Sequence, residues 1–304
     1  MTYSQFIKET SRKLSELYPE REAIAIATRL LQHFCGISSY EHLVEPFGAI
    51  APEVVPILEV AVSELAEARP LQYVIGWQEF CGLQIAVEEG VLIPRPETEE
   101  LVMWVAEVVQ GPELLCQTEN SLKILDAASG SGAIACALAS KLPEAEIFAC
   151  DISDKALEIT SKNLNSLGFS NAQVFKCDLL NNAAQAVLQS VITTDLEPKE
   201  HIDIIVSNPP YVTELEKLQM RPNVLEYEPN EALFVPDTNP LLFYKALRDL
   251  ALELLLPGGA IFMEINEQFS CETAALFSDE HFSKVEIRKD ILDKPRMVMA
   301  VKTS

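Results

Sequence analysis

The chain has 304 residues, of which 48% are hydrophobic, and its 46 acidic residues outnumber its 23 Lys and Arg to give a net charge of −23. A chain this acidic repels the phosphate backbone of DNA and RNA unless it carries a local basic stripe. The sequence shows none, so direct binding to nucleic acid is not expected. No apolar run reaches transmembrane length and the first residues do not read as a secretion signal, so we expect a soluble, cytoplasmic protein with no membrane association.

The sequence shows no sign of a disulfide framework or a metal centre. Its seven cysteines are an odd number and none forms a Cys-x-x-Cys pair, so neither structural disulfides nor a zinc ribbon is indicated. The four histidines are scattered, without partners at the spacing of metal ligands. We therefore expect most cysteines to be small core residues and the functional site to hold no metal.

Residues 1 to 70 have the apolar periodicity of helices. One helix is expected to begin at Pro19 and to end at Gly36, and another apolar stripe runs from Val54 to Leu65 before Pro70 stops it. No residue in this part has an obvious chemical role. The pattern predicts a small helical bundle, and the function open to such a bundle is to dock a partner.

Residues 71 to 95 change character and predict a β-hairpin that links two domains. Three glycines separate short extended pieces, at Glu79 to Val87 and at Val91 to Ile93. A proline and the acids after it then start a helix over Thr98 to Val109. This helix start does not account for Arg95, which is held between two prolines and could reach into a neighbouring site.

From Leu122 onward, predicted strands alternate with predicted helices. Such alternation implies an α/β domain with a parallel sheet and helices on both of its faces. The last two strands are too close in sequence for a helical crossover, so they should pair antiparallel at the end of the sheet. The strands are expected at Leu122–Leu125, Glu146–Cys150, Ala172–Lys176, Ile202–Val206, Gly258–Ile265, His281–Ile287 and Met297–Lys302, and the helices at Ser131–Leu142, Asp154–Leu167 and Pro240–Leu254.

A turn of small residues follows the first of these strands. Over Ala127 to Gly132, backbone N–H groups can approach a ligand closely, as in nucleotide-binding turns. Asp151 ends the next strand about 20 residues further on, where an acid binds ribose hydroxyls in such folds; it could instead cap the following helix. Asp178 and Leu179 end the third strand, where an acid can accept from an adenine amino group while an apolar side chain covers the ring. The pattern predicts an adenosine site.

Asp126, which precedes this turn, distinguishes between adenosine cofactors. A dinucleotide site must hold a pyrophosphate, usually with the pattern Gly-x-Gly-x-x-Gly. Here the glycines read Gly-x-Gly after an acid, and that acid would repel a pyrophosphate but suits a cationic amino-acid end. The arrangement therefore favours S-adenosylmethionine, whose amino group and sulfonium are both positive.

The segment Ser207-Asn208-Pro209-Pro210-Tyr211 ends a predicted strand, because two consecutive prolines cannot donate to a sheet ladder. Open α/β sheets place their ligands at such carboxyl ends. The amide of Asn208, the carbonyl of Pro209 and the ring of Tyr211 suit a planar NH2 group, since two acceptors can take its two N–H bonds while a ring packs beside it. Taken alone, the segment could also be an ordinary strand-ending turn.

Joined together, these stretches resemble a known family. The chain is similar to the protein-(glutamine-N5) methyltransferases of peptide-chain release factors, the HemK/PrmC family, over nearly its whole length and most weakly in the N-terminal helices. Asn-Pro-Pro-Tyr is shared with several amino-group methyltransferases, but its combination with Leu-Ile-Pro-Arg-Pro-Glu-Thr-Glu is highly specific. The matching stretches are Pro70–Gly76, Glu79–Leu83, Gly90–Glu99, Asp126–Gly132, Asp151–Ser153 and Ser207–Tyr211.

The resemblance implies an architecture and an activity. It implies a Rossmann-like, seven-stranded methyltransferase domain over residues 96–304, preceded by a helical domain over residues 1–70 that docks the release factor and by a hairpin linker over residues 71–95. The implied reaction transfers a methyl group from S-adenosylmethionine to the side-chain amide nitrogen of the glutamine in the Gly-Gly-Gln motif of class 1 release factors, leaving S-adenosylhomocysteine. Such a protein would serve translation termination, and we expect it to be a monomer.

The resemblance also implies roles for the site residues. Asn208 Oδ1 and the Pro209 carbonyl would accept the two amide protons, Tyr211 would pack against the amide plane, and no dedicated general base is evident. Pro210 and Arg95 would join these three in binding the substrate. The cofactor would be held by Asp126, Ala128, Ser129, Gly130, Ser131, Gly132, Asp151, Asp178, Leu179 and Asn208.

Three departures from the family pattern concern loops. Ala128 stands in place of the first glycine of the acid-x-Gly-x-Gly-x-Gly motif, and we expect it to be tolerated with a negative φ and a slightly altered cofactor contact. Residues 235–241 replace a glycine-rich sequence with a stiffer loop that contains proline. Residues 293–296 lack a usual glycine.

Two other functions are open. An adenine-N6 methyltransferase acting on DNA or RNA also targets a planar NH2 beside a ring nitrogen, so the same loop would serve it. The missing basic groove and the missing target-recognition domain argue against that function. A non-catalytic adenosine-binding module, acting through its helical domain, is the second alternative, and the intact Asn208–Tyr211 segment argues against it.

Overall fold

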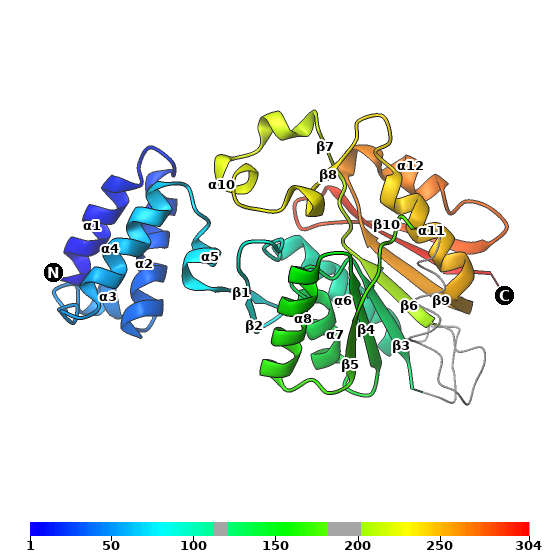
Figure 1. Cartoon of the computed structure of the whole chain (residues 1–304), viewed down its shortest axis with the longest axis horizontal. Coiled ribbons are helices and arrows are strands. Elements are labelled where there is room, and N and C mark those ends of the chain that lie inside the picture. Colours follow the sequence, from blue (N-terminus) through cyan, green and yellow to red (C-terminus); the bar gives the residue numbers. More distant parts are fainter. Residues whose placement is uncertain (112–120, 182–201, 304) are drawn as a thin grey trace. The chain divides into compact units, whose positions relative to one another are not determined.

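The computed structural model of the protein describes residues 1–111, 121–181 and 202–303. Their contacts divide the chain into two compact units. One unit is helical and contains Met1–Trp77 with Arg221–Tyr227, and the other holds the large sheet and contains Gln78–Met220 with Glu228–Ser304. Figure 1 shows the elements of both units.

The helical unit is built around α2 (Glu20–Cys35), against which α1 (Tyr3–Lys13), α4 (Val55–Ala66) and α5 (Leu71–Ile75) pack. As predicted, α2 starts after Pro19 and ends at Gly36, whose φ of 68° is a left-handed conformation that glycine adopts without strain. A further helix of this unit, α3 (Glu41–Val44), is a single turn. The leucines at the centre of this unit are almost fully buried, at positions 14, 30, 31, 58 and 65.

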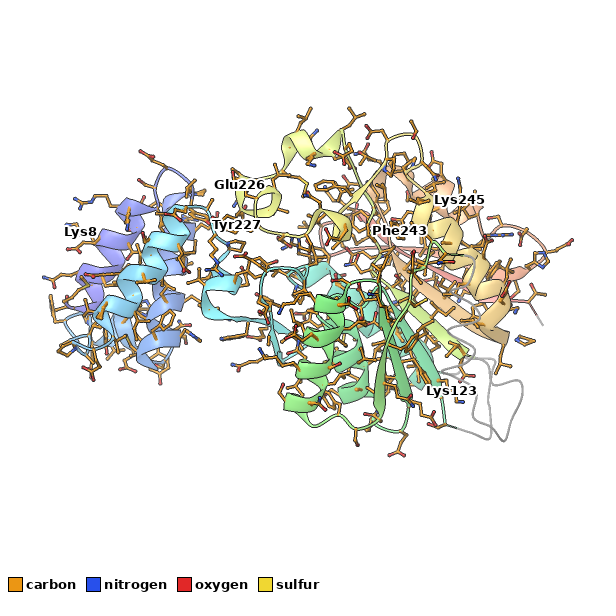
Figure 2. The ribbon with its side chains drawn as sticks, in the orientation of Figure 1. Lys8, Lys123, Glu226, Tyr227, Phe243 and Lys245 are labelled. Carbon is orange, nitrogen blue, oxygen red and sulfur yellow. The ribbon has the colours of Figure 1, made fainter. Side chains whose placement is uncertain are left out.

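Residues 221–227 belong to the helical unit although they lie in the second half of the chain. Arg221 Nη1 lies 2.9 Å from Glu22 Oε1, and α10 (Pro222–Leu225) follows. The hydroxyl of Tyr227, which Figure 2 labels, donates to the Glu67 carbonyl at 2.8 Å. A segment this short has no hydrophobic periodicity of its own, so the sequence pattern did not predict where it packs.

A two-stranded hairpin follows the first helices. It consists of β1 (Trp77–Phe80) and β2 (Leu83–Ala86). Its two turn residues, Cys81 and Gly82, have φ of 50° and 79°, and positive φ at both central positions is the geometry of a tight hairpin turn. The second predicted piece, Val91 to Ile93, is not a strand.

The larger unit contains a seven-stranded sheet in the order β10-β11-β9-β6-β3-β4-β5. Its five consecutive strands from β9 to β5 are parallel, and β11 pairs antiparallel with both β9 and β10. The predicted α/β class and the predicted antiparallel pair at the end of the sheet are therefore confirmed. The strands are β3 (Lys123–Ala127), β4 (Glu146–Asp151), β5 (Ala172–Lys176), β6 (Ile202–Ser207), β9 (Leu255–Glu264), β10 (Phe282–Lys289) and β11 (Pro295–Lys302).

Helices cover both faces of this sheet. On one face, α6 (Pro96–Gln110), α7 (Ala133–Lys141) and α8 (Asp154–Leu167) pack together. Trp104 of α6 packs edge-on against Phe262 of β9, with 5.4 Å between the centroids of the two rings. On the other face, α11 (Leu242–Leu254) shares a core with Ile261 and Met263, and α12 (Ser270–Ala275) packs against β10 and β11. Successive strand residues point to opposite faces of a sheet, so Phe262 points toward α6 while its neighbours Ile261 and Met263 point toward α11.

Short elements connect β6 to α11. β7 (Val212–Thr213) pairs parallel with β8 (Phe234–Val235), and the single turns η1 (Glu216–Gln219), η2 (Asn230–Ala232) and, after β9, η3 (Glu267–Phe269) complete the unit. The proline-containing loop at residues 235–241 thus starts from a strand, and its Asn239 N–H donates to the Pro236 carbonyl at 2.9 Å.

The second altered loop joins β10 to β11. Asp293 has a φ of 64°, the left-handed conformation in which glycine is usual, and Asp is one of the few other residues that adopt it readily. In the ranges that the structure describes, no helix combines the length and the apolar character needed to cross a membrane.

Candidate functional site

A cavity of about 230 Å³ lies at the carboxyl ends of β3, β4, β5 and β6. β4 and β6 lie on opposite sides of β3 in the sheet, since β3 pairs with both of them. Such a topological switch is where open α/β sheets bind ligands. From the four strand ends, the wall receives Ala128–Ser131, Asp151–Ser153, Cys177–Leu180, and Asn208 with Pro210.

Most residues predicted for the site lie in the wall of this cavity. Asp126, Gly132, Pro209 and Tyr211 are not lining residues. The wall also contains Phe80, Glu231 and Phe243, which no predicted motif assigned to the site; Figure 2 labels Phe243. The predicted site residues that the cavity brings together are Arg95, Ala128, Ser129, Gly130, Ser131, Asp151, Asp178, Leu179, Asn208 and Pro210.

The turn after β3 requires the left-handed conformation at alternate residues. Ala128, Gly130 and Gly132 have φ of 63°, 55° and 76°. The expectation that Ala128 keeps a negative φ is therefore wrong. The turn imposes its backbone course on whichever residue stands there, and a side chain in this conformation costs about 1–2 kcal/mol. Gly132 has a second constraint, since a Cβ there would lie 2.7 Å from Thr160 Cγ2.

Asp151 holds the turn by accepting two backbone hydrogen bonds. Its Oδ2 accepts from Gly130 N–H and its Oδ1 from Ser153 N–H, both at 2.9 Å. The cap of α8 is Ser153, whose Oγ accepts from Ala156 N–H, so Asp151 does not serve as that cap. Burial raises the pKa of Asp151, and these hydrogen bonds oppose the rise. Each oxygen of a carboxylate has a further lone pair, so Asp151 can still accept from a ligand hydroxyl.

Asp126 is buried beneath the turn rather than exposed in the cavity wall. Its side chain is 0% exposed, and Oδ2 accepts from Ala135 N–H at 3.0 Å. Oδ1 is buried without a hydrogen-bond partner among the described residues. Burial raises the pKa of Asp126 to about 7, with a smaller contribution from the charge of Asp151. An orphaned buried carboxylate oxygen is costly, and a ligand cation nearby would offset that cost.

The end of β5 supplies a second acid to the cavity wall, Asp178. Asp178 Oδ1 accepts from Leu180 N–H at 2.9 Å, which fixes the side chain next to Leu179 in the wall. Together with the narrow turn and Asp151, this arrangement has the chemistry of an adenosine site: a turn with close backbone approach, an acid for the ribose, and an acid beside an apolar cover for the base.

Asn208 follows β6 and lines the same cavity as the turn. Ser207 Oγ donates to the Ala127 carbonyl at 2.6 Å, which joins the ends of β6 and β3. Asn208 Nδ2 donates to Thr98 Oγ1 at 3.1 Å, and Thr98, at the start of α6, also lines the cavity. Asn208 makes no other side-chain hydrogen bond within the described residues.

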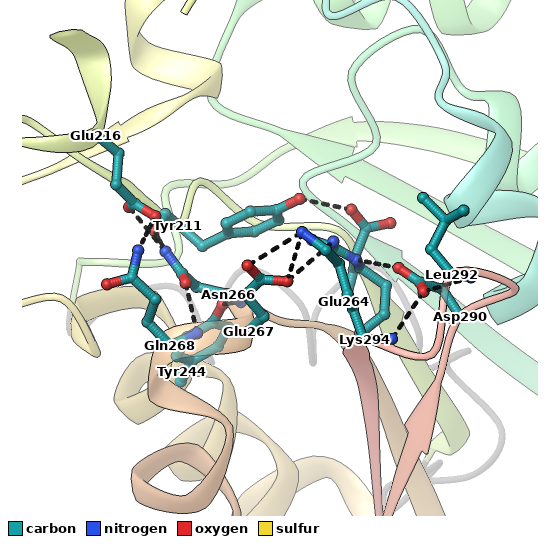
Figure 3. Close-up of polar contacts among 11 residues, drawn as sticks. Tyr211, Glu216, Tyr244, Glu264, Asn266, Glu267, Gln268, Asp290, Leu292 and Lys294 are labelled. Atoms are coloured by element: carbon teal, nitrogen blue, oxygen red, sulfur yellow. Dashed lines mark hydrogen bonds and ion pairs between the residues drawn. The ribbon is translucent and has the colours of Figure 1, made fainter. Parts of the chain in front are cut away.

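Tyr211 is anchored by a buried acid. Its hydroxyl donates to Glu264 Oε1 at 2.7 Å, as Figure 3 shows, and Glu264 is only 2% exposed. Burial and the facing carboxylate raise the pKa of Tyr211, so the phenol keeps its proton. Glu264 Oε2 accepts from Thr98 Oγ1 at 2.6 Å. One carboxylate thus connects Tyr211 to the residue that holds Asn208.

Asn266 holds the backbone of the same segment. Its Nδ2 donates to the Tyr211 carbonyl at 3.2 Å and to Glu216 Oε2 at 2.8 Å, and its N–H donates to Tyr244 Oη at 3.0 Å (Figure 3). Neither Glu264 nor Asn266 was predicted from the sequence to belong to the site. The signal that could have found them is their place at and just after the end of β9, the strand next to β6.

Arg95 lies in the cavity wall and pairs with a buried acid. Its Nη2 is 2.7 Å from Glu228 Oε1, and Glu228 Oε2 accepts from Ile93 N–H at 3.2 Å. The side chain of Glu228 is 1% exposed and that of Arg95 is 32% exposed. Glu228 therefore fixes both the backbone before Arg95 and the direction of its guanidinium, which has further donors for a ligand.

The described residues contain no cluster of three or more His, Cys, Asp or Glu that could hold a metal ion. No disulfide joins any of the six cysteines within those residues; Cys116 lies outside them.

Comparison with known proteins gives consistent matches. The model of the Methyltransferase small domain family matches residues 103–227. The chain is 36% identical over 285 residues to the release factor glutamine methyltransferase of Flavobacterium psychrophilum, covering 94% of each chain. It is 36% identical over 290 residues to that of Bacteroides thetaiotaomicron, covering 95% of this chain and 96% of the relative. It is 32% identical over 276 residues to that of Chlorobaculum tepidum, covering 90% and 89%.

Identity at this level over nearly the full length of both proteins confirms the resemblance drawn from the motifs. The chain belongs to the family of release factor glutamine methyltransferases.

Proposed function

We propose that this chain transfers a methyl group from S-adenosylmethionine to the side-chain amide nitrogen of the glutamine in the Gly-Gly-Gln motif of class 1 peptide-chain release factors. Membership of the family supplies the reaction class. The observation that carries the finer proposal is the place of Asn208 in the wall of the cavity that also contains Asp151 and Asp178. A carboxamide there can receive a planar NH2 group next to an adenosine ligand.

The cofactor assignment rests on the chemistry of the cavity wall. Asp151 would accept from the ribose hydroxyls, Asp178 from the adenine amino group, and Leu179 would cover the ring. The buried Oδ1 of Asp126 lacks a partner among the described residues, which suits the cationic amino-acid end. The backbone of Ala128–Gly132 would lie against the ligand. Bound here, S-adenosylmethionine would supply a methyl group made electrophilic by its positive sulfur.

Asn208 and Pro209 would act on the weak nucleophile. An amide nitrogen is unreactive because its lone pair is delocalised into the carbonyl. With Asn208 Oδ1 and the Pro209 carbonyl each accepting one amide proton, the nitrogen is held in one orientation, and the positive charge that grows on it is stabilised. The methylated nitrogen then loses a proton to solvent, so we assign no general base.

Tyr211, Pro210 and Arg95 complete the substrate side. We propose that the ring of Tyr211 packs beside the amide plane while Glu264 fixes its hydroxyl. Pro210 and Arg95 lie in the cavity wall, and the guanidinium of Arg95 keeps donors for carbonyl groups of the substrate loop beyond the one directed at Glu228.

We assign docking of the release factor to residues 1–70, the linker to residues 71–95 and catalysis to residues 96–304. The helical residues have a hydrophobic core of their own, which supports a separate role for them. Tyr40, Leu43 and Phe47 expose 65%, 72% and 83% of their surface. Large apolar side chains exposed to solvent are typical of surfaces that bind another protein.

One experiment tests the substrate. The protein is incubated with S-adenosylmethionine labelled in its methyl group and a class 1 release factor, in parallel with a release factor whose Gly-Gly-Gln glutamine is changed to alanine. An oligonucleotide containing adenine serves as a third substrate. Mass spectrometry locates the label.

The proposal predicts label on that glutamine alone. Label on the alanine variant, elsewhere on the release factor or on adenine would each contradict it, and label on adenine would favour the alternative of a nucleic-acid methyltransferase.

A further inference from the structure

Asn208 is linked to a buried carboxylate through one hydroxyl. Asn208 Nδ2 lies 3.1 Å from Thr98 Oγ1, and Thr98 Oγ1 lies 2.6 Å from Glu264 Oε2. Thr98 is 4% exposed and Glu264 is 2% exposed. Asn208 directly follows β6, Thr98 lies in α6 and Glu264 ends β9, and the two pairs are 110 and 166 residues apart in sequence.

The hydrogen bonds in this chain of contacts all donate toward Glu264. Thr98 donates its proton to Glu264 Oε2 and Tyr211 donates its proton to Glu264 Oε1. Burial raises the pKa of Glu264, whereas these two hydrogen bonds and the charge of Arg296 lower it, and an ionised carboxylate only accepts hydrogen bonds. A hydroxyl has one proton, and once Thr98 has given it to Glu264, only lone pairs remain to face Asn208. The amide of Asn208 must therefore turn its NH2 end toward Thr98.

This choice decides what a ligand meets. The two ends of a carboxamide are about 120° apart around one carbon, so an NH2 end committed to Thr98 leaves Oδ1 as the end available to the cavity. If the amide turned over, the cavity would present two donors in place of an acceptor. Donors would oppose the N–H groups of a substrate amide instead of binding them.

We propose that Thr98, backed by Glu264, is a positioning residue that fixes which end of the Asn208 amide faces the substrate. The inference rests on the role proposed above for Asn208. Neither Thr98 nor Glu264 needs to touch the reacting nitrogen, since each acts through the next residue in the chain of contacts.

The surrounding packing keeps the three groups in register. Thr98 lies in the first turn of α6, and its N–H donates to the Arg95 carbonyl at 3.1 Å. Two turns further along α6, Trp104 packs edge-on against Phe262, two residues before Glu264. The helix that presents the hydroxyl is thus held against the strand that presents the carboxylate.

The first test observes the amide itself, without cofactor or release factor. In protein labelled with ¹⁵N-asparagine, the side-chain signal of Asn208 is identified by its absence in Asn208→Ala. We expect a nuclear Overhauser contact between the Nδ2 protons and the Thr98 methyl, and slow exchange of one Nδ2 proton with water. Thr98→Ser should keep the signal near its wild-type position, and Thr98→Val should move it. A wild-type signal with rapid exchange and no such contact overturns the proposal, even if Thr98→Val does not fold.

The second test measures turnover of the intact enzyme on a release factor. Thr98→Val removes the hydroxyl at nearly constant volume, and kcat should fall by about tenfold, the factor that corresponds to one ordinary hydrogen bond. KM for the release factor and the dissociation constant of S-adenosylmethionine should not change, and Thr98→Ser should recover most of kcat. An unchanged kcat in Thr98→Val, or an equal loss in Thr98→Ser, contradicts the positioning role.

The two tests separate this inference from the proposed function. If the wild-type protein methylates no release factor, the proposed function fails, and the amide signal still decides whether Thr98 orients Asn208. If the wild-type protein is active and Thr98→Val is equally active, only the positioning role fails.

Discussion

The hydroxyl of Tyr211 donates to Glu264 Oε1 over 2.7 Å, which ties the segment after β6 to the last residue of β9. Because the acid is almost fully buried, it depends on its two hydroxyl partners, Tyr211 and Thr98, for hydrogen bonds. The segment that carries Asn208 is therefore anchored from inside the protein rather than from the solvent side.

Removing this anchor should lower stability. In Tyr211→Phe the buried carboxylate loses one donor, and a hydrogen bond to a charged group contributes roughly 1.5–3 kcal/mol. We expect a decrease of that size in the free energy of unfolding, measured by urea denaturation. Tyr40→Phe is the matched control, because Tyr40 is 65% exposed and its loss should change stability by less than about 0.5 kcal/mol. Equal effects of the two changes would show that the bond to Glu264 is not important.

Arg95 and Glu228 should respond unequally to substitution. Arg95→Ala leaves the buried carboxylate of Glu228 without its cation, whereas Glu228→Gln leaves a guanidinium that is one third exposed and can reach water. We expect Arg95→Ala to cost roughly 2–3 kcal/mol, a value reduced from that of a fully buried pair because of this exposure, and Glu228→Gln to cost less. The double variant should be more stable than Arg95→Ala alone. Urea denaturation of the three variants measures their free energies of unfolding, and a double variant less stable than both single variants would contradict the prediction.

Replacing Ala128 with glycine should stabilise the folded protein. Its φ of 63° costs an alanine about 1–2 kcal/mol. Glycine would relieve this strain, but part of the gain in stability is lost because glycine gives the unfolded chain more conformational freedom. Ala128→Gly should therefore raise the free energy of unfolding by roughly 0.5–1 kcal/mol. Gly130→Ala is the reverse control in the same turn, since a Cβ at Gly130 would meet nothing within 4 Å and should cost only the conformational term. A loss of stability in Ala128→Gly would contradict the strain at this position.

Asp126 should make stability depend on pH. Burial raises its pKa to about 7 in the folded protein, while an unfolded Asp titrates near pH 3.9. Between these values the folded state holds a proton that the unfolded state has released. The free energy of unfolding therefore falls as pH rises from about 4 to about 7, and levels off above.

Asp126→Asn should remove this part of the decline, which amounts to at most about 4 kcal/mol. Urea denaturation at several pH values measures it. Glu264, another buried acid whose pKa is raised, contributes equally to both proteins. Asp151 interacts with Asp126 by charge, so the difference between the two curves measures Asp126 together with that smaller coupling. Parallel curves would mean that Asp126 is ionised in the folded protein throughout this range.

Much of the sheet and of the cavity wall was predictable from the sequence. Apolar runs located the parallel strands, because strands buried on both faces are apolar throughout. The ends of parallel strands share one edge of a sheet, so residues after separate strands, such as Asp151 and Asn208, could be predicted to lie near one cavity without knowing the strand order.

The support of Asn208 was not predictable in the same way. Thr98 looked like part of a helix start and Glu264 like the end of an ordinary strand, and only tertiary packing brings them into contact. The φ of Ala128 was mispredicted because small residues permit a tight turn without specifying which of them takes the left-handed conformation. Each of these features depends on neighbours that are distant in sequence or on backbone geometry that composition does not encode.

The most direct test of the central claim is the rate of methyl transfer in Asn208→Ala, measured in a single turnover with a release factor, beside the affinity of the variant for S-adenosylmethionine. If Asn208 Oδ1 orients the substrate amide, the rate should fall by about 100-fold or more while the cofactor still binds, because one preorganised hydrogen-bonding group at a reacting centre contributes that much. Transfer at the wild-type rate by a folded Asn208→Ala protein would contradict the claim.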